Sequence, residues 1–202
     1  MEQTTREKIL SSGKKMFLEM GFQSAPLRKI VAQAGFTQGA FYGYFKTKED
    51  LFYALTDEFV EKTFILLDMV QEEMEALPAE RRLFEMSGCY LRHLPEIVAH
   101  FSTYQAEFKL VVRCGEGTKY AGLLDTLAQR NISQLKESLQ AFYQLSEAEE
   151  KLLTILMKGY FSMLAQIILE QGEEEMLQMM IGVHMVFEQG IVKLFQLSAK
   201  GK

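Results

Sequence analysis

The stretch from Gln38 to Phe45 carries side chains suited to lying against a nucleic-acid backbone. It contains two tyrosines, a pair of phenylalanines and two glycines but no acidic residue. A segment that contacts phosphate has this character, because carboxylates would be repelled there. Just before it, Gly35 can end one helix in the left-handed backbone conformation, and Thr37 can cap the next. The pattern therefore predicts a helix-turn-helix.

The composition indicates an all-α protein. A chain of 202 residues fits one large or two small domains, and a hydrophobic fraction of 48% is enough for a buried core. The two cysteines lie outside any paired motif, which favours reduced thiols in a cytoplasmic compartment. The first residues are polar and charged, and we expect no stretch of ~18 uncharged apolar residues that would span a membrane. A soluble, cytoplasmic protein without a membrane partner is expected.

The net charge of −5 for the whole chain is unfavourable for nucleic-acid binding, but the charge is not evenly distributed along the sequence. Residues 1–50 hold eight basic and five acidic residues, a net charge of +3, which leaves −8 for the remainder. A basic head on an acidic body can bind DNA through the head while the body is repelled. The charge distribution alone is also compatible with chance.

Three short helices are expected in the first fifty residues. Apolar residues recur at helical spacing over about residues 4–20, Gly21 ends that helix, and Pro26 fits the first position of the second helix. The third helix is too small to bury much by itself. Phe41 and Phe45 must therefore pack inward, which leaves both of its tyrosines facing outward.

Over about the first fifty positions the chain matches a family pattern, without a gap from Gly21 to Leu51. The matched residues are Arg6, Ile9, Leu10, Phe17, Gly21, Phe22, Leu27, Arg28, Ile30, Ala34, Gly35, Phe36, Thr37, Gly39, Phe41, Tyr42, Tyr44, Phe45, Lys48, Glu49 and Leu51. This resembles the DNA-binding domain of the TetR-like (TetR/AcrR) transcriptional repressors. The resemblance implies a helix-turn-helix domain at residues 1–47 and an effector-binding and dimerisation domain at residues 48–202, with about nine helices in all. It also implies a homodimer that binds a palindromic double-stranded DNA operator and releases it when a small molecule binds.

The resemblance also assigns roles to individual residues. Three of them are expected nearest the base edges in the major groove, and four near phosphate. The base-reading residues are Gln38, Gly39 and Tyr42, and the phosphate contacts are Thr37, Tyr44, Lys48 and, from the second helix, Arg28. Lys48 is expected to act together with the N–H groups at the start of the fourth helix. One departure from the family is Ala25-Pro26, where Thr-Ser is common.

The sequence pattern of the rest of the chain predicts long helices separated by proline and glycine residues. Pro78 is expected to end the fourth helix, Pro95 to separate the fifth from the sixth, and Gly172 to end the eighth after a capping signal at Ser146. The expected ranges are 48–76, 80–94, a sixth helix from Pro95 through Phe108, then 119–143, 146–172 and 173–197.

The last two helices are expected to form the homodimer. Apolar residues step along each of them at intervals of three or four: Leu152, Leu156, Tyr160, Met163 and Ile167 on one, and Met176, Met180, Val183, Phe187, Ile191 and Leu194 on the other. Gly159, Gly182 and Gly190 would let helix backbones approach closely. Such a pair can form a four-helix bundle with its twofold mate, although both helices could instead pack on their own body.

An effector pocket is expected among the middle helices, where aromatic residues and methionine could line an apolar cavity with a few polar anchors. The candidates are Phe64, Tyr90, His93, Phe101, Tyr104, Phe108, Met157 and Phe161. Each of them also suits a plain core position. Their chemistry favours a hydrophobic or aromatic effector.

The alternative function is that of a metal- or redox-responsive regulator that uses Cys89, His93 and Cys114. Cys89, His93 and His100 would share a face of a continuous helix and suit zinc or copper, but Pro95 is expected to break that helix. We therefore predict no metal site and no cofactor. The chain shows no Gly-rich phosphate loop after a strand, no nucleophile elbow and no His-carboxylate pair, so an enzyme is not expected.

Overall fold

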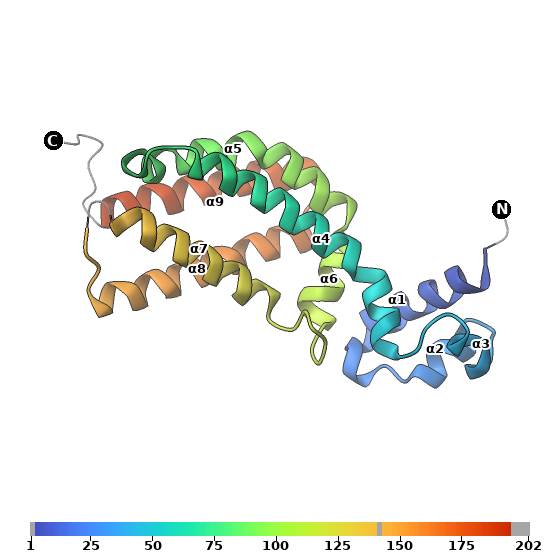
Figure 1. Ribbon diagram of the computed structural model, residues 1–202. Helices are drawn as coiled ribbons and strands as arrows, with labels where there is room; N and C mark the ends of the chain where they lie inside the picture. The colour runs from blue at the N-terminus through green and yellow to red at the C-terminus, as the bar shows by residue number, and fades with distance from the viewer. Residues whose placement is uncertain (1–2, 141–142, 195–202) are drawn as a thin grey trace. The chain divides into compact units, whose positions relative to one another are not determined.

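The structure is a computed structural model that describes residues 3–140 and 143–194, apart from the side chains of residues 79, 80, 83, 84 and 192. Its regular elements in the described ranges are all helices, which confirms the predicted all-α fold (Figure 1). They are α1 (Thr5–Ser24), α2 (Leu27–Gln33), α3 (Gln38–Tyr42), α4 (Lys48–Glu75), α5 (Ala79–Thr103), α6 (Gln105–Cys114), α7 (Leu123–Gln140), α8 (Glu147–Glu170) and α9 (Glu173–Leu194). The end expected for the ninth helix, at residue 197, lies outside the described residues.

The helices form two compact units. The N-terminal unit contains Met1–Lys62 and Tyr104–Leu123, and the C-terminal unit contains Thr63–Thr103 and Leu124–Lys202. Helix α4 contributes its first half to one unit and its second half to the other. The N-terminal unit is larger than the expected segment 1–47 because α6 packs against α1. The functional boundary at residues 47 and 48 stays a prediction.

The core of the N-terminal unit is built around an aromatic cluster. The rings of Phe17 and Phe22 on α1 and Phe52 on α4 lie with their centroids 5.3 to 5.7 Å apart. Helices α1 and α4 approach closely at Gly13, where an added Cβ would lie 2.8 Å from a methyl carbon of Leu51. This packing fixes the base on which the two short helices α2 and α3 rest.

The end of the first helix follows the prediction. Gly21 has φ 75° and ψ 160°, a conformation that glycine adopts without the steric cost of a Cβ, and it breaks the regular helix inside α1. One further helical turn, residues 22–24, follows the break. Pro26 lies one position earlier than expected, because it is the N-cap of α2 and Leu27 is its first residue.

The prediction that Pro95 ends a helix is wrong. Helix α5 continues through Pro95 to Thr103, and the break comes at Tyr104, before α6. A proline inside a helix loses one backbone hydrogen bond. Leu94, Ile97 and Val98 around it are buried at 3% exposure or less, so packing of this apolar face offsets the loss.

Glycines shape the connection between α6 and α7. Gly117 and Gly122 have φ of 84° and 77°, and α7 therefore begins at Leu123 rather than at residue 119 as expected. The capping signal at Ser146 is confirmed, because Ser146 and Glu149 form a reciprocal capping box. Gly172 does not cap α8 as expected. The C-cap is Gln171 in an extended conformation.

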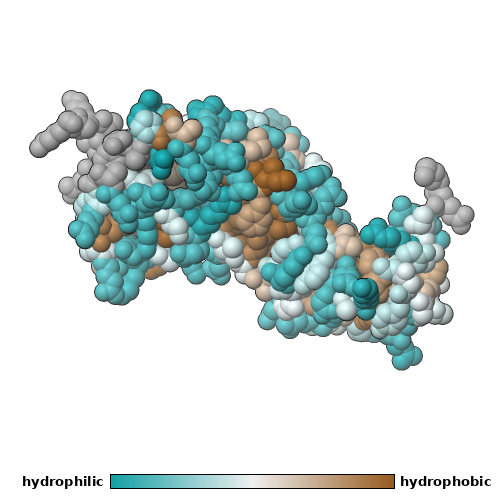
Figure 2. Space-filling view, viewed as in Figure 1, coloured by the Kyte–Doolittle hydropathy of each residue, from teal (hydrophilic) through white to brown (hydrophobic). Residues whose placement is uncertain are grey.

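In the C-terminal unit, α9 packs against both α5 and α8 (Figure 1). About half of the apolar stripe predicted for dimerisation is buried inside this unit, including Tyr160, Ile167, Met176, Met180 and Ile191. Three other residues of that stripe, Leu152, Met163 and Leu194, are exposed, and so are Ile155, Met179, Met185 and Val186 on the same two helices. The space-filling view shows a mostly hydrophilic surface interrupted by limited apolar patches (Figure 2).

Helix α8 is long and apolar enough to cross a membrane by length and composition, which the sequence analysis did not expect of any stretch. One such helix is weak support for a membrane span, because the core helix of a soluble protein has the same character. In α8 the buried residues are Leu153, Met157, Tyr160, Leu164, Ala165, Ile167 and Ile168. They contribute to the core of the C-terminal unit.

Candidate DNA-binding site

A tight turn joins α2 to α3. Gly35 has φ 81°, and the backbone N–H groups of Gly35 and Phe36 donate to the carbonyl oxygens of Ala32 and Val31 at 3.0 and 3.1 Å. Thr37 then caps α3, since its hydroxyl oxygen accepts a hydrogen bond from the backbone N–H of Ala40 at 3.3 Å. The turn and the cap together confirm the helix restart that the sequence predicts.

Helix α3 presents one apolar and one exposed face. Phe41 is fully buried and Phe45 almost so, and their rings pack 5.5 Å apart in the same core cluster as Ile30 and Val31. Tyr42 and Tyr44 are 57% and 51% exposed, respectively. Hydrophobic anchoring of a five-residue helix through two phenylalanines fixes its orientation.

The exposed face contains most of the residues that the sequence assigned to DNA. Thr37, Gln38, Gly39, Tyr42 and Tyr44 are all exposed, and α3 itself supplies three of them. A Cβ added at Gly39 would meet only the Thr37 hydroxyl oxygen within 4 Å, at 3.7 Å, so the backbone here is open to a close approach. Arg28 is exposed on α2. Contacts of these residues with bases or phosphates stay predictions.

Lys48 is engaged within the chain. Its ammonium group donates hydrogen bonds to the carbonyl oxygens of Phe22, Gln23 and Ala25 at 2.7, 3.2 and 3.1 Å. It also lies 4.5 Å from the centroid of the Phe22 ring, a cation–π contact. Lys48 therefore holds the carbonyl groups that follow the break at Gly21. The sequence offered no signal for this contact, since the partners are backbone atoms 23 to 26 residues away.

The start of α4 carries its own cap. The carboxylate of Asp50 accepts hydrogen bonds from the backbone N–H groups of Lys46 and Thr47, and the Thr47 hydroxyl accepts one from the N–H of Asp50. Among the first N–H groups of α4, which were expected to bind phosphate together with Lys48, that of Asp50 is thus satisfied by the Thr47 hydroxyl. The phosphate contact expected at the start of α4 stays a prediction.

A buried tether joins α1 to α2. The hydroxyl of Ser12 donates to the carbonyl oxygen of Ile30 at 2.7 Å, and this hydrogen bond is buried. Sequence reasoning missed this residue, although a serine within the apolar stripe of the first helix is a recognisable signal. The tether fixes the position of the helix that leads into the turn.

The residues predicted for the effector pocket are divided between the two units. Phe64, Tyr90, His93, Phe101, Met157 and Phe161 belong to the C-terminal unit, whereas Tyr104 and Phe108 belong to the N-terminal unit.

His93 and Tyr104 of this set each lie against a carboxylate. His93 Nε2 lies 2.8 Å from a carboxylate oxygen of Glu73, and the Tyr104 hydroxyl donates to Glu58 at 2.9 Å. The effector-binding role of the whole set stays a prediction.

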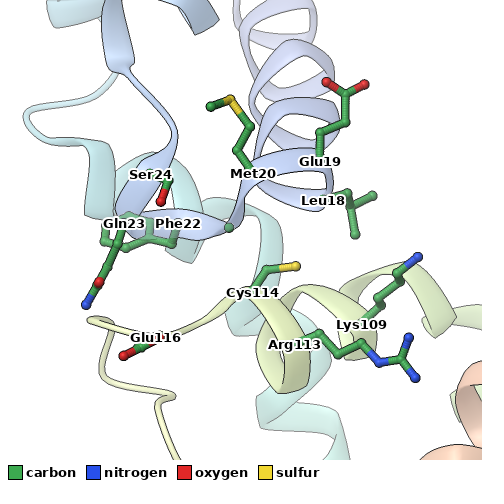
Figure 3. A pocket seen from close by; sticks show the side chains of 11 residues that line it. Leu18, Glu19, Met20, Phe22, Gln23, Ser24, Lys109, Arg113, Cys114 and Glu116 are labelled. Carbon is green, nitrogen blue, oxygen red and sulfur yellow. The ribbon is translucent and has the colours of Figure 1, made fainter.

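A hollow of about 370 Å³ lies within the N-terminal unit, between the end of α1 and α6. Figure 3 shows Lys109, Arg113 and Cys114 of α6 opposite residues 18–24 of α1. Glu19 and Glu116 add negative charge to the same lining. None of the predicted effector residues lines this hollow, and its mixed charge indicates no ligand class.

The cysteines show no feature of a metal or redox site. Because α5 is continuous, the spacing of Cys89, His93 and His100 does suit one helix face, but the His100 ring is hydrogen-bonded to Thr63. Within the described residues no cluster of three His, Cys, Asp or Glu side chains could hold a metal. Burial raises the pKa of the Cys89 thiol, and it also raises the pKa of Cys114. A raised pKa lowers the fraction of reactive thiolate.

A short exposed helix that follows another across a tight turn, on a packed aromatic base, defines a helix-turn-helix DNA-binding protein. Residues 9–55 match the family model described as bacterial regulatory proteins, tetR family. Over this segment the chain is similar to the TetR-like transcriptional regulators. This class is a DNA-binding class and not an enzyme class, in agreement with the sequence analysis.

The similarity to most of the curated relatives covers only part of each chain. The chain is 44% identical over 50 residues to the HTH-type transcriptional regulator AcrR of Shigella flexneri, covering 25% of this chain and 23% of the relative. It is 27% identical over 140 residues to the fatty acid metabolism regulator protein of Bacillus subtilis, covering 65% of this chain and 71% of that protein. The chain spans only 23% to 30% of the length of the other curated relatives.

The solved structures support the fold over the whole chain. The TetR family regulator PfmR of Thermus thermophilus superposes with a TM-score of 0.53, covering 99% of this chain and 100% of PfmR, at 17% sequence identity. At this identity the likeness shows the fold alone.

Proposed function

We propose that the chain is a ligand-responsive transcriptional repressor that binds a palindromic operator as a homodimer. The observation that carries the proposal is the exposed surface formed by Gln38, Gly39 and Tyr42 of α3 and by Tyr44 just after it, on a helix anchored by the buried Phe41. In this proposal Gln38 and Tyr42 read base edges and Gly39 allows the backbone to approach them. Thr37, Tyr44 and Arg28 contact phosphate.

The net charge of +3 over residues 1–50 favours this orientation. Basic residues attract the duplex to the helix-turn-helix, while the acidic remainder of the chain is repelled by it. Affinity is therefore expected to fall as salt rises, because each phosphate contact releases counterions. Sequence preference rests on the few side chains that reach base edges.

The dimer is proposed to form through the exposed faces of α8 and α9. Ile155 and Val186 are 68% and 70% exposed, which is unusual for β-branched apolar side chains in a water-soluble monomer. Gly159, Gly182 and Gly190 lie on the same two helices, and a Cβ added at any of them would meet nothing within 4 Å. A second copy can therefore approach these backbones closely.

The effector is proposed to be a small, predominantly apolar molecule. The relative matched over 65% of the chain is named a fatty acid metabolism regulator, which makes a molecule with a long apolar portion a reasonable candidate. By linkage, an effector that lowers operator affinity must itself bind more weakly to the DNA-bound dimer. A cytoplasmic location follows from the proposed role.

A direct test is a gel-shift titration of the purified chain on DNA from upstream of its own gene, with unrelated DNA of equal length as competitor. The proposal expects a discrete complex that survives excess competitor and weakens with salt. Complexes that the competitor removes completely would show binding without sequence preference and would refute the repressor role.

A further inference from the structure

Three polar side chains meet in the interior of the C-terminal unit. Tyr90 on α5 stacks on His184 on α9, with ring centroids 4.4 Å apart and an interplanar angle of 25°. The hydroxyl of Tyr160 on α8 lies 3.2 Å from His184 Nδ1, in a buried hydrogen bond. The side chains of Tyr90 and Tyr160 also lie close enough to affect each other's pKa. We call these three residues the polar trio.

One atom of the polar trio is left unsatisfied. His184 is only 8% exposed, and its Nε2 atom has no hydrogen-bond partner among the described residues. A buried polar atom without a partner costs about 1–3 kcal/mol, so most buried polar atoms in native proteins are paired. The unpaired Nε2 is a position where a bound molecule would supply the missing hydrogen bond.

The polar trio carries no charge near neutral pH. Burial lowers the pKa of His184, so its imidazole is neutral, with Glu188 acting in the opposite direction. Burial raises the pKa of Tyr90 to about 12 and also raises that of Tyr160, so both hydroxyls remain protonated. The site therefore offers hydrogen bonds without a counter-charge for an ion.

Apolar side chains surround the polar trio. Phe187, one turn after His184 on α9, has its ring centroid 4.9 Å from that of Tyr160. Met157 is buried one turn before Tyr160 on α8, and Met180 is buried one turn before His184. Methionine adapts its shape readily to a bound group. The neighbourhood of the polar trio therefore contains apolar as well as polar side chains.

We propose that the polar trio of Tyr90, Tyr160 and His184 anchors the effector, and that the effector is an uncharged, predominantly apolar alcohol or phenol. The inference rests on the proposed function, since it names the ligand class of the regulator. A hydroxyl group can both donate and accept, so it completes the hydrogen bonding of Nε2 in either tautomer of His184. A carboxylate is disfavoured because the trio provides no positive charge and Glu188 adds negative potential nearby.

Sequence reasoning identified only part of this site. Tyr90 and Met157 were candidates for the effector pocket, but Tyr160 was assigned to the dimer stripe and His184 to no role. The structure brings Tyr160 and His184 together because both lie on the inner face of their helices. A histidine within the apolar stripe of the last helix was the available signal.

The test uses three probes of one shape: 4-ethylphenol, 4-ethyltoluene and 4-ethylbenzoate. The chain contains three histidines, so its histidine-labelled imidazole ¹⁵N spectrum is simple, and His184→Phe assigns the signal of interest. We expect 4-ethylphenol to shift the His184 signals and to bind about tenfold more tightly than either of the other probes, since one recovered hydrogen bond is worth about this factor. Tyr160→Phe should reduce the preference for the phenol.

Tyr143→Phe is the matched control. The Tyr143 hydroxyl donates to Glu149 at the start of α8, away from the polar trio in the sequence, so this variant should bind all three probes with wild-type affinity. The inference is overturned if 4-ethylphenol leaves the His184 signals unmoved, or if His184→Phe or Tyr160→Phe retains the full preference for the phenol. If His184→Phe fails to fold, the His184 signals are assigned by substituting the other two histidines, His93 and His100, and the wild-type spectrum still decides the matter. Operator binding is measured separately, without any probe. Loss of site-specific DNA binding with an intact phenol preference would refute the repressor role and leave the site standing.

Discussion

Replacing Lys48 by methionine tests how the DNA-binding segment is held in place. The substitution keeps an unbranched apolar side chain over the Phe22 ring but removes three hydrogen bonds to the carbonyl oxygens of Phe22, Gln23 and Ala25. A hydrogen bond to a charged group contributes about 1.5–3 kcal/mol, but these three share one partly exposed ammonium group and do not add. We expect a loss of about 2 kcal/mol in the free energy of unfolding.

Urea unfolding measures this loss. With a slope near ~2 kcal/mol per M, the midpoint should fall by about 1 M. Lys46→Met is the matched control, because Lys46 is exposed and two residues away, and its effect should stay within about 0.5 kcal/mol. Equal midpoints for the two variants would refute the structural role of Lys48. DNA binding adds a second readout, since loss of a phosphate contact reduces the slope of log K against log salt by about 0.9, whereas loss of positioning alone leaves that slope unchanged.

Three further substitutions test other parts of the account. Tyr42→Ala should lower operator affinity by roughly ten- to a hundredfold in a gel-shift titration while the dimer persists, and unchanged affinity would show that the recognition surface is wrongly assigned. Ile155→Glu should shift the dimer towards monomer in analytical ultracentrifugation, and Ile65→Glu on α4 is the control. If the Ile155→Glu variant remains as dimeric as the control, the proposed interface is wrong. Gly13→Ala should destabilise the fold by about 1 kcal/mol, although alanine favours helices, because its Cβ would lie 2.8 Å from the buried Leu51 of α4. A more stable variant would contradict this close packing.

The helix-turn-helix was predictable because its signals are local. Gly35 requires a positive φ, Thr37 caps the helix that follows it, and Phe41 and Phe45 can be buried only if α3 turns them inward. Each inference depends on a few neighbouring residues. For the same reason the capping box at Ser146 was recognised correctly.

Features that depend on tertiary packing could not be predicted. Pro95 is a strong helix breaker in isolation, but burial of Leu94, Ile97 and Val98 keeps α5 intact. The apolar period along α8 and α9 does not distinguish a residue that faces its own core from one that faces a second copy. The sequence predicts that Lys48 contacts phosphate, whereas in the structure its ammonium group donates hydrogen bonds to backbone carbonyl groups.

The central claim is that α3 reads an operator in a dimeric regulator, and hydroxyl-radical footprinting of the chain on its own upstream DNA tests it most directly. The account predicts two protected half-sites related by a twofold axis, about one helical turn or a multiple of it apart, and loss of both on Gln38→Ala combined with Tyr42→Ala. Uniform protection along the DNA, or a single protected site that survives the double substitution, would contradict it.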